Sequence, residues 1–171
     1  MALSYTFTLA KPDAVRRKLV GRIISRFEER GLDLVDVKWH WPSEALIREM
    51  YLDKATESFF PELLAFMTSG PSVAMVWQGE EAVEKGRQVI GSKLPLDSDA
   101  GSLRGAFAED RIQSLVHGSR SEAEAYAEMV LWFPERWAGE AAPAEDRPAA
   151  DAPKSEEPAL MRAWEFEEEL A

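Results

Sequence analysis

The stretch Val73-Ala74-Met75-Val76-Trp77 decides the fold. A short apolar run of this kind predicts a central strand that is buried on both faces of a sheet. Gly70-Pro71 ends a helical pattern just before the run, and another helical pattern over residues 80–90 follows it. The centre of the chain is therefore expected to be a sheet flanked by helices.

Strands and helices alternate on both sides of this central run. Apolar patterns predict strands over 5–10, 32–39, 73–77 and 115–116, and helices over about 19–30, 43–52, 61–68, 80–90 and 121–133. Lys11-Pro12-Asp13 breaks the first strand, Gly31 ends the first helix, and Ser43 is the expected N-cap of the second. This order matches the ferredoxin-like βαββαβ plan, an α+β sandwich with an antiparallel sheet and a helical insert. A long loop over 91–113 is expected to carry function.

The acidic charge of the chain is concentrated at its end. Residues 138–171 hold ten acids and three bases, whereas the rest of the chain holds twenty-one and seventeen. We expect a catalytic domain over 1–137, then an acidic Ala/Pro-rich linker over 138–157 that buries too little apolar surface to fold. A docking segment is expected over 158–171, where Trp164 and Phe166 pack on the domain or on another subunit. The alternative is a wholly disordered tail.

Composition excludes several classes of protein. The 171 residues include no Cys, which excludes a disulfide framework, a thiolate zinc site and a cysteine nucleophile. Charged residues and a proline interrupt the first twenty residues, so we expect neither a signal peptide nor a membrane span. No clustered basic surface indicates nucleic-acid binding. The expectation is a cytoplasmic protein with neither a membrane nor a nucleic acid as its partner.

His117 is the first candidate for chemistry, in the stretch Leu115-Val116-His117-Gly118-Ser119. A strand end would hold the imidazole, Gly118 would let a ligand approach, and a hydroxyl follows directly. A neutral imidazole is a competent nucleophile at pH 7. The alternative is a histidine that is satisfied in the core, which is the commoner situation beside an apolar run.

Four cations lie in the segments expected to surround this histidine: Lys11, Arg87, Lys93 and Arg104. Arginine forks match phosphate geometry, although any one of these charges could equally be a solvated surface residue. Residues 86–93 resemble a P-loop, but they end in Ser-Lys and follow a helix instead of a strand. A phosphate site here would therefore work without a P-loop, and the chain has no GxGxxG fingerprint either.

Four segments together carry a resemblance to a known family: Lys11-Pro12-Asp13, Gly70-Pro71 with the run 73–77, Gly101-Ser102-Leu103-Arg104-Gly105, and Val116-His117-Gly118-Ser119. In this order and spacing, over about residues 4–136, the chain resembles the nucleoside diphosphate kinases. The resemblance implies a ping-pong reaction in which a nucleoside triphosphate, mainly ATP, phosphorylates His117 and the phosphohistidine then phosphorylates a nucleoside diphosphate. It also implies Mg²⁺ held by nucleotide phosphates and water, and a homo-oligomer that is a hexamer or a tetramer.

The resemblance assigns roles residue by residue. It makes His117 the nucleophile, Glu128 the carboxylate that orients the imidazole, and Ser119 the neighbouring hydroxyl. The implied substrate contacts are Lys11, Tyr51, Arg87 and Arg104 on the phosphates and sugar, Phe59 stacked on the base, Arg111 at the other face of the base, Ser114 on the sugar, and Lys93 facing phosphate, with Lys11 also counted as catalytic. Stacking on an aromatic ring tolerates every base, which suits broad specificity.

The chain departs from the family pattern at four positions. Ser114 stands where the family usually has Asn, Lys93 where it has Thr, and Ala106 and Arg120 where Asp is common. These departures leave two alternatives. One is a protein of the same fold with weak kinase activity that mainly binds nucleotides or partners, and the other is a ferredoxin-like assembly module with an acidic recruiting tail. Both alternatives are disfavoured because the chain keeps the other implied site residues together: Lys11, Tyr51, Arg87, Arg104, His117 and Glu128.

Overall fold

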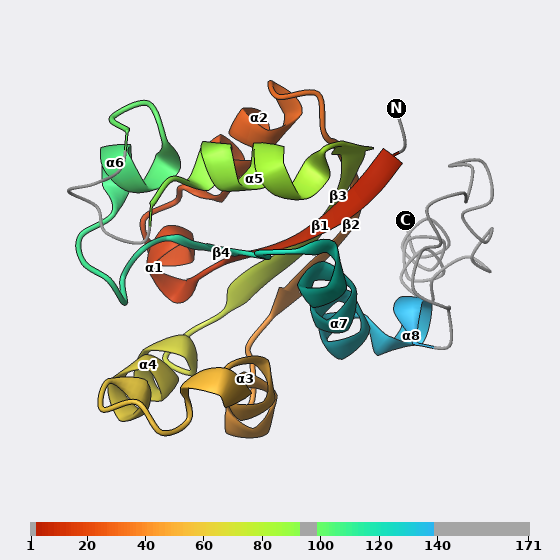
Figure 1. The fold of residues 1–171 in the computed structure, drawn as a ribbon. Helices are drawn as coiled ribbons and strands as arrows, with labels where there is room; N and C mark the ends of the chain where they lie inside the picture. The colour runs from red at the N-terminus through yellow and green to blue at the C-terminus, as the bar shows by residue number, and fades with distance from the viewer. Residues whose placement is uncertain (1–2, 93–98, 139–171) are drawn as a thin grey trace, which may run out of the picture.

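The computed structural model describes residues 3–92 and 99–138 of the chain. Four strands form one antiparallel sheet in the order β2-β3-β1-β4: Leu3–Ala10 (β1), Asp33–His40 (β2), Ser72–Glu80 (β3) and Val116–Gly118 (β4). The helices are Pro12–Arg16 (α1), Val20–Glu28 (α2), Glu44–Met50 (α3), Phe60–Met67 (α4), Ala82–Ile90 (α5), Leu103–Phe107 (α6), Glu122–Trp132 (α7) and Pro134–Trp137 (α8), with a 3-10 turn at Leu52–Lys54 (η1). The α+β, ferredoxin-like prediction is confirmed (Figure 1).

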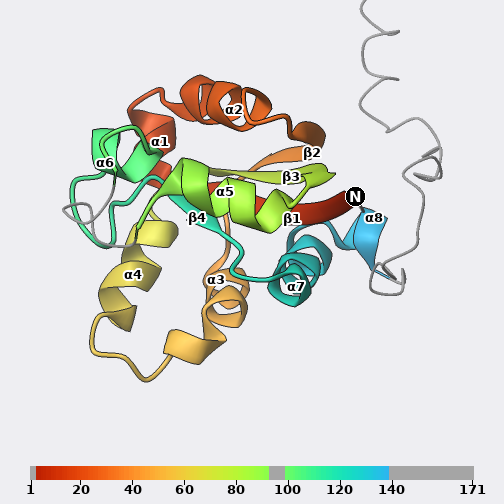
Figure 2. The same ribbon diagram turned by 45° about the horizontal axis from the view of Figure 1, so that its top comes forward.

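Strand β3 is central and buried, as its apolar run predicts. Its side chains alternate between two cores on opposite faces of the sheet. Met75 and Trp77 belong to the core shared with α2 and α5, whereas Ala74 and Val76 belong to the core shared with α3, α4 and α7. Figure 2 shows these two groups of helices on opposite sides of the sheet. Helices cover both faces of β3, which explains why residues 73–77 are all apolar and do not alternate with polar residues.

Three short helices lie where the sequence shows only breaks or loops. The break at Lys11-Pro12-Asp13 ends β1 as expected, and Pro12 then begins α1, since a proline needs no backbone N–H at the first helical position. Inside the long loop, Ser102 caps α6 by accepting a hydrogen bond from the Gly105 N–H. Helix α8 follows α7 at Pro134. All three helices are five residues or shorter, too short to show a periodic pattern.

The predicted boundaries shift by a few residues, and the predicted caps are present. The Ser43 hydroxyl accepts from the Leu46 N–H at the start of α3, and Gly31 has a φ of 73° just after α2. Strand β3 runs on to Glu80 before α5 begins, and β4 starts one residue later than expected. Lys93, most of the predicted linker and the whole docking segment lie outside the described residues.

The predicted helical insert forms an arm that consists of α3, η1 and α4 (residues 44–67), here called the helical arm. It projects from the sheet on the side of α7 (Figure 1). Buried residues of the arm, including Ile47, Leu63 and Met67, share a core with Phe7 of β1. The arm is therefore fixed to the sheet at its base, while Leu52 near its tip is exposed.

Candidate active site

A strained turn places His117 at the end of the sheet. Leu115 has a φ of 67°, and the Val116 N–H donates to the Ser114 carbonyl over 2.8 Å, which closes a three-residue turn. The Lys11-Pro12-Asp13 segment holds this turn from both sides. The Asp13 carboxylate accepts from the Leu115 N–H at 3.0 Å, and the Lys11 N–H donates to the Leu115 carbonyl at 2.8 Å. Two motifs a hundred residues apart thus fix one local conformation.

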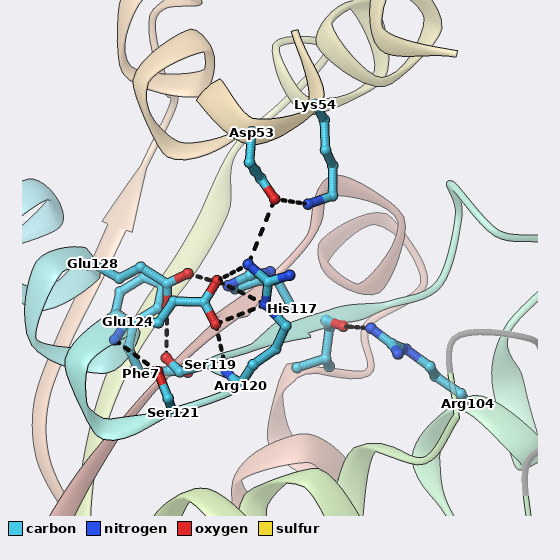
Figure 3. A network of polar contacts seen from close by, with 11 residues as sticks. Phe7, Asp53, Lys54, Arg104, His117, Ser119, Arg120, Ser121, Glu124 and Glu128 are labelled. Atoms are coloured by element: carbon cyan, nitrogen blue, oxygen red, sulfur yellow. Dashed lines mark hydrogen bonds and ion pairs between the residues drawn. The ribbon is translucent and has the colours of Figure 1, made fainter. Parts of the chain in front are cut away.

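The imidazole of His117 is oriented by a buried carboxylate. His117 Nε2 lies 2.6 Å from Glu128 Oε1, and the Ser119 hydroxyl donates to Glu128 Oε2, also over 2.6 Å (Figure 3). Glu128 comes from α7 and is 5% exposed, so these two partners satisfy both of its oxygens away from water. A carboxylate can only accept, which places the proton on Nε2 and leaves the lone pair on Nδ1.

Two aromatic rings enclose the imidazole. The Tyr51 ring, from the end of α3, meets it edge-on with centroids 5.8 Å apart, and Phe7 of β1 lies at 6.3 Å. The Tyr51 hydroxyl is buried and has no hydrogen-bond partner in the described part of the chain. Burial, together with the negative charge of Glu128, raises the pKa of Tyr51 far above its usual value, so the phenol stays protonated. The Tyr51 hydroxyl can therefore donate a hydrogen bond to a ligand that binds beside His117.

Two cations, the buried Lys11 and the partly buried Arg104, lie next to the strained turn. The Lys11 ammonium donates to the Ser114 hydroxyl at 3.0 Å and to the Ile112 carbonyl at 3.2 Å. Burial, and then the charge of Arg104, lowers the pKa of Lys11 to about 8. The Arg104 guanidinium donates to the Val116 carbonyl at 2.7 Å, and burial lowers its pKa as well. Because these partners are neutral, they leave the positive charges available to an anion.

A cleft of about 1310 Å³ opens above these groups. Its lining includes Tyr51, Arg87, Arg104, Arg111 and His117, five of the residues that the sequence singles out. The cleft lies between the helical arm, α5, α6 and the start of α7. The structure thus brings side chains from distant segments to one cleft, and among the described residues that line it seven are Lys or Arg and four are Asp or Glu.

Other predicted site residues lie away from the cleft surface. Ser119 and Glu128 are buried against His117, and Lys11 and Ser114 are buried beside it. Phe59 is half-buried at the start of α4, packs against the core beneath the arm, and is not among the described residues that line the cleft. Its stacking on a base stays a prediction. The same holds for Lys93, which is outside the described residues.

Sequence reasoning treated Arg120 only as a departure and missed its partners. The Arg120 guanidinium lies in the cleft beside His117 and binds Glu124 at 2.8 Å and Asp53 at 3.5 Å (Figure 3). The Arg120–Glu124 spacing of four residues was a visible signal for a helical ion pair. Asp53 could not be found in this way, because it reaches the pair only through the tertiary fold.

The described residues do not form a preorganised metal-binding site. Within 3–92 and 99–138, no group of three or more His, Cys, Asp or Glu side chains is placed to hold a metal ion. In the same ranges, no helix is long and apolar enough to cross a membrane.

Comparisons with known proteins agree with this geometry. The family model described as nucleoside diphosphate kinase matches residues 4–137. The nucleoside diphosphate kinase of Neurospora crassa is 48% identical over 128 residues, 75% of this chain and 84% of that protein, and the one from Eremothecium gossypii is 45% identical over 128 residues, 75% and 85%. The crystal structure of the enzyme from Encephalitozoon cuniculi superposes with a TM-score of 0.76 at 36% identity, covering 81% of this chain and 94% of that one. These findings favour the kinase over the binding-module alternatives, and the chain belongs to the nucleoside diphosphate kinase family.

Proposed function

We propose that this kinase transfers the γ-phosphoryl group of a nucleoside triphosphate, mainly ATP, to a nucleoside diphosphate through a phosphohistidine at His117. In the first half-reaction the Nδ1 lone pair attacks the γ-phosphorus, an N–P bond forms, and the nucleoside diphosphate leaves with the electrons of the broken P–O bond. In the second half-reaction a different nucleoside diphosphate attacks the phosphohistidine with its terminal phosphate oxygen, and the imidazole leaves.

The observation that carries this proposal is the 2.6 Å contact between His117 Nε2 and Glu128 Oε1 beneath a cationic cleft. It fixes the tautomer that attacks, and it stabilises the positive charge that the ring gains when the N–P bond forms. Arg87 and Arg104 are proposed to hold the phosphate oxygens at the cleft, with the Tyr51 hydroxyl and Lys11 as further donors, and Arg111 is proposed to lie at one face of the base. Phe59 and Ser114 remain the proposed contacts of the base and the sugar.

Mg²⁺ is proposed to enter with the nucleotide. The donor set fits this arrangement, because the cleft offers arginines for phosphate, and Arg120 already occupies the carboxylates Asp53 and Glu124. A bound Mg²⁺ would neutralise phosphate oxygens and hold them in line for transfer. The residues of this chain would orient the nucleotide and the imidazole.

The remaining parts of the proposal concern assembly and location. A homo-oligomer, a hexamer or a tetramer, is supported by Val37, Trp39 and Trp41, which are more than half exposed on and just beyond the edge strand β2. A cytoplasmic location suits the Cys-free composition and the nucleotide substrates. The domain over 1–137 with a linker over 138–157 and a docking segment over 158–171 also stays a proposal.

Because the chain has two histidines, the test has a built-in control. The protein is incubated with γ-labelled ATP and Mg²⁺, and we expect an acid-labile, base-stable phosphoprotein that GDP discharges into labelled GTP. The His117→Gln variant should take up no label, whereas His40→Gln, at the exposed end of β2, should be labelled like the wild type. Label that persists in His117→Gln, or label that GDP does not discharge, would contradict the proposal.

A further inference from the structure

Arg120 links two parts of the structure that face each other across the cleft. Its Nε and Nη2 atoms contact the two oxygens of Glu124 on α7 at 2.8 to 3.1 Å, and its backbone N–H also donates to Glu124 at 2.5 Å. Its Nη2 lies 3.5 Å from Asp53 Oδ2 in η1 of the helical arm. Figure 3 shows the guanidinium beside the imidazole of His117 with these carboxylates around it. Arg120 therefore bridges the α7 start and the arm next to the reacting nitrogen.

Without this bridge, Glu124 would add an uncompensated negative charge to the cleft. Asp53, Glu124 and Glu128 lie close to one another around His117, and the charges of Asp53 and Glu128 both act on Arg120. A nucleoside triphosphate brings several negative charges to the same place. Glu128 is occupied by His117 and Ser119, and Asp53 also binds Lys54 at 2.9 Å. Glu124 lines the cleft and would face the polyphosphate. Arg120, which binds Glu124 and also contacts Asp53, removes this repulsion.

The contact geometry is stronger than that of an ordinary surface ion pair. Exposed pairs contribute little unless they are bidentate or belong to a network, and this pair satisfies both conditions. Lys54 extends the network, because its ammonium binds the same Asp53 oxygen at 2.9 Å. Burial acts to raise the pKa of Glu124, but the hydrogen bonds from Arg120 outweigh it and the net shift is downward. Glu124 is thus held as a charge-compensated carboxylate.

We propose that Arg120 is a positioning residue for the nucleotide: it neutralises Glu124, shares Asp53 with Lys54 and ties the helical arm to the start of α7, without itself binding phosphate. The inference rests on the proposed function, since it concerns polyphosphate binding at the same cleft. It also gives Arg120 a role that does not depend on contact with the reacting atoms. Its loss should weaken nucleotide binding more than it slows the chemical step.

The test separates compensation of the carboxylates from direct contact with the nucleotide. KM for ATP and kcat are measured in steady state, and the rate of His117 labelling in single turnover, for the wild type, Arg120→Gln and Arg120→Lys. The same Arg120→Gln change is then made in an Asp53→Asn/Glu124→Gln background. Arg48→Gln is the matched control, because Arg48 forms an exposed ion pair with Glu44 at the same four-residue spacing, outside the cleft.

We expect Arg120→Gln to raise KM about five-fold, as for the loss of about 1 kcal/mol, with kcat nearly unchanged. Arg120→Lys should recover part of the loss, and Arg48→Gln should behave like the wild type. In the background that lacks both carboxylates, the Arg120→Gln change should have no further effect on KM. This non-additivity is the signature of a charge that acts through Asp53 and Glu124.

Three results would overturn the proposal. A five-fold rise in KM that persists in the Asp53→Asn/Glu124→Gln background would show that Arg120 contacts the nucleotide directly. An unchanged KM in Arg120→Gln, with a wild type that labels and turns over normally, would refute the positioning role and leave the proposed function intact. A wild type that does not label at His117 would refute both.

Discussion

Nucleotide affinity should fall as the pH rises through about 8, because Lys11 then loses its charge. Burial and the neighbouring Arg104 lower the pKa of Lys11 from 10.5 to about 8 in the nucleotide-free protein. A bound polyphosphate favours the charged ammonium and raises this pKa again. Below about pH 7 Lys11 is already almost fully protonated and affinity should be constant. Above pH 8 binding must take up a proton, so affinity should decline.

The size of the effect follows from the same pKa. At pH 9 about one Lys11 in ten carries its proton, so affinity should be about ten-fold weaker than on the acidic plateau. The affinity for Mg·ADP is measured by isothermal titration calorimetry from pH 6.5 to 9.5, in pairs of buffers with different ionisation enthalpies. The calorimetric heat in each pair should report the uptake of one proton above pH 8 and of none below pH 7.

The Lys11→Met variant is the control, because it keeps the length of the side chain and removes the titrating group. The affinity of Lys11→Met for Mg·ADP should be weaker at neutral pH and should not decline through pH 8. Any pH dependence that comes from the nucleotide itself appears in both proteins and can be subtracted. A wild-type affinity that stays flat from pH 7.5 to 9.5 would refute the reasoning. So would a decline of equal size in Lys11→Met.

Two further predictions test the orientation of the nucleophile and the local backbone. Glu128→Gln keeps an acceptor for His117 but loses the negative charge. Because a charge-assisted hydrogen bond contributes about 1.5–3 kcal/mol, single-turnover phosphorylation of the variant should be about ten- to hundred-fold slower. An unchanged rate would show that the charge of Glu128 is unimportant. Lys18 has a φ of 58°, a left-handed conformation that glycine adopts without the strain felt by other residues. Lys18→Gly should therefore raise the free energy of unfolding, measured in urea, by about 0.5–1 kcal/mol after the greater freedom of the unfolded chain is subtracted. Lys18→Ala keeps the strained backbone and should not stabilise the protein, and equal stabilisation by both variants would refute this explanation.

Much of the fold could be predicted from local pattern. The apolar run 73–77 identified the central strand, since only a strand covered on both faces tolerates so few polar positions. Ser43 and Gly31 marked helix ends because capping is a property of neighbouring residues. The short helices α1, α6 and α8 gave no periodic signal: α6 begins at the Ser102 cap, whereas α1 and α8 begin at a proline and have no side-chain cap.

The candidate site divides in the same way. His117 and its neighbours could be named from one short motif, and the family resemblance supplied Glu128, which the structure places 2.6 Å from the ring. The role of Arg120 could not be foreseen. Its ion pair with Glu124 is local, but Asp53 lies sixty-seven positions earlier in the chain and reaches Arg120 only because the helical arm folds back toward α7.

The sequence by itself determined the order of the strands and of the longer helices along the chain, the apolar strand at the centre and the histidine that we propose carries the chemistry. These features depend on spacing and on side-chain type, which can be read along the chain. The tertiary structure alone decided which charges are compensated and which are left for a ligand. Lys11 is buried and Arg104 partly buried against neutral partners, whereas Arg120 is paired with Glu124 and Asp53. The physical reason is that burial and the distance between charges set their energies, and both arise only when remote segments pack together.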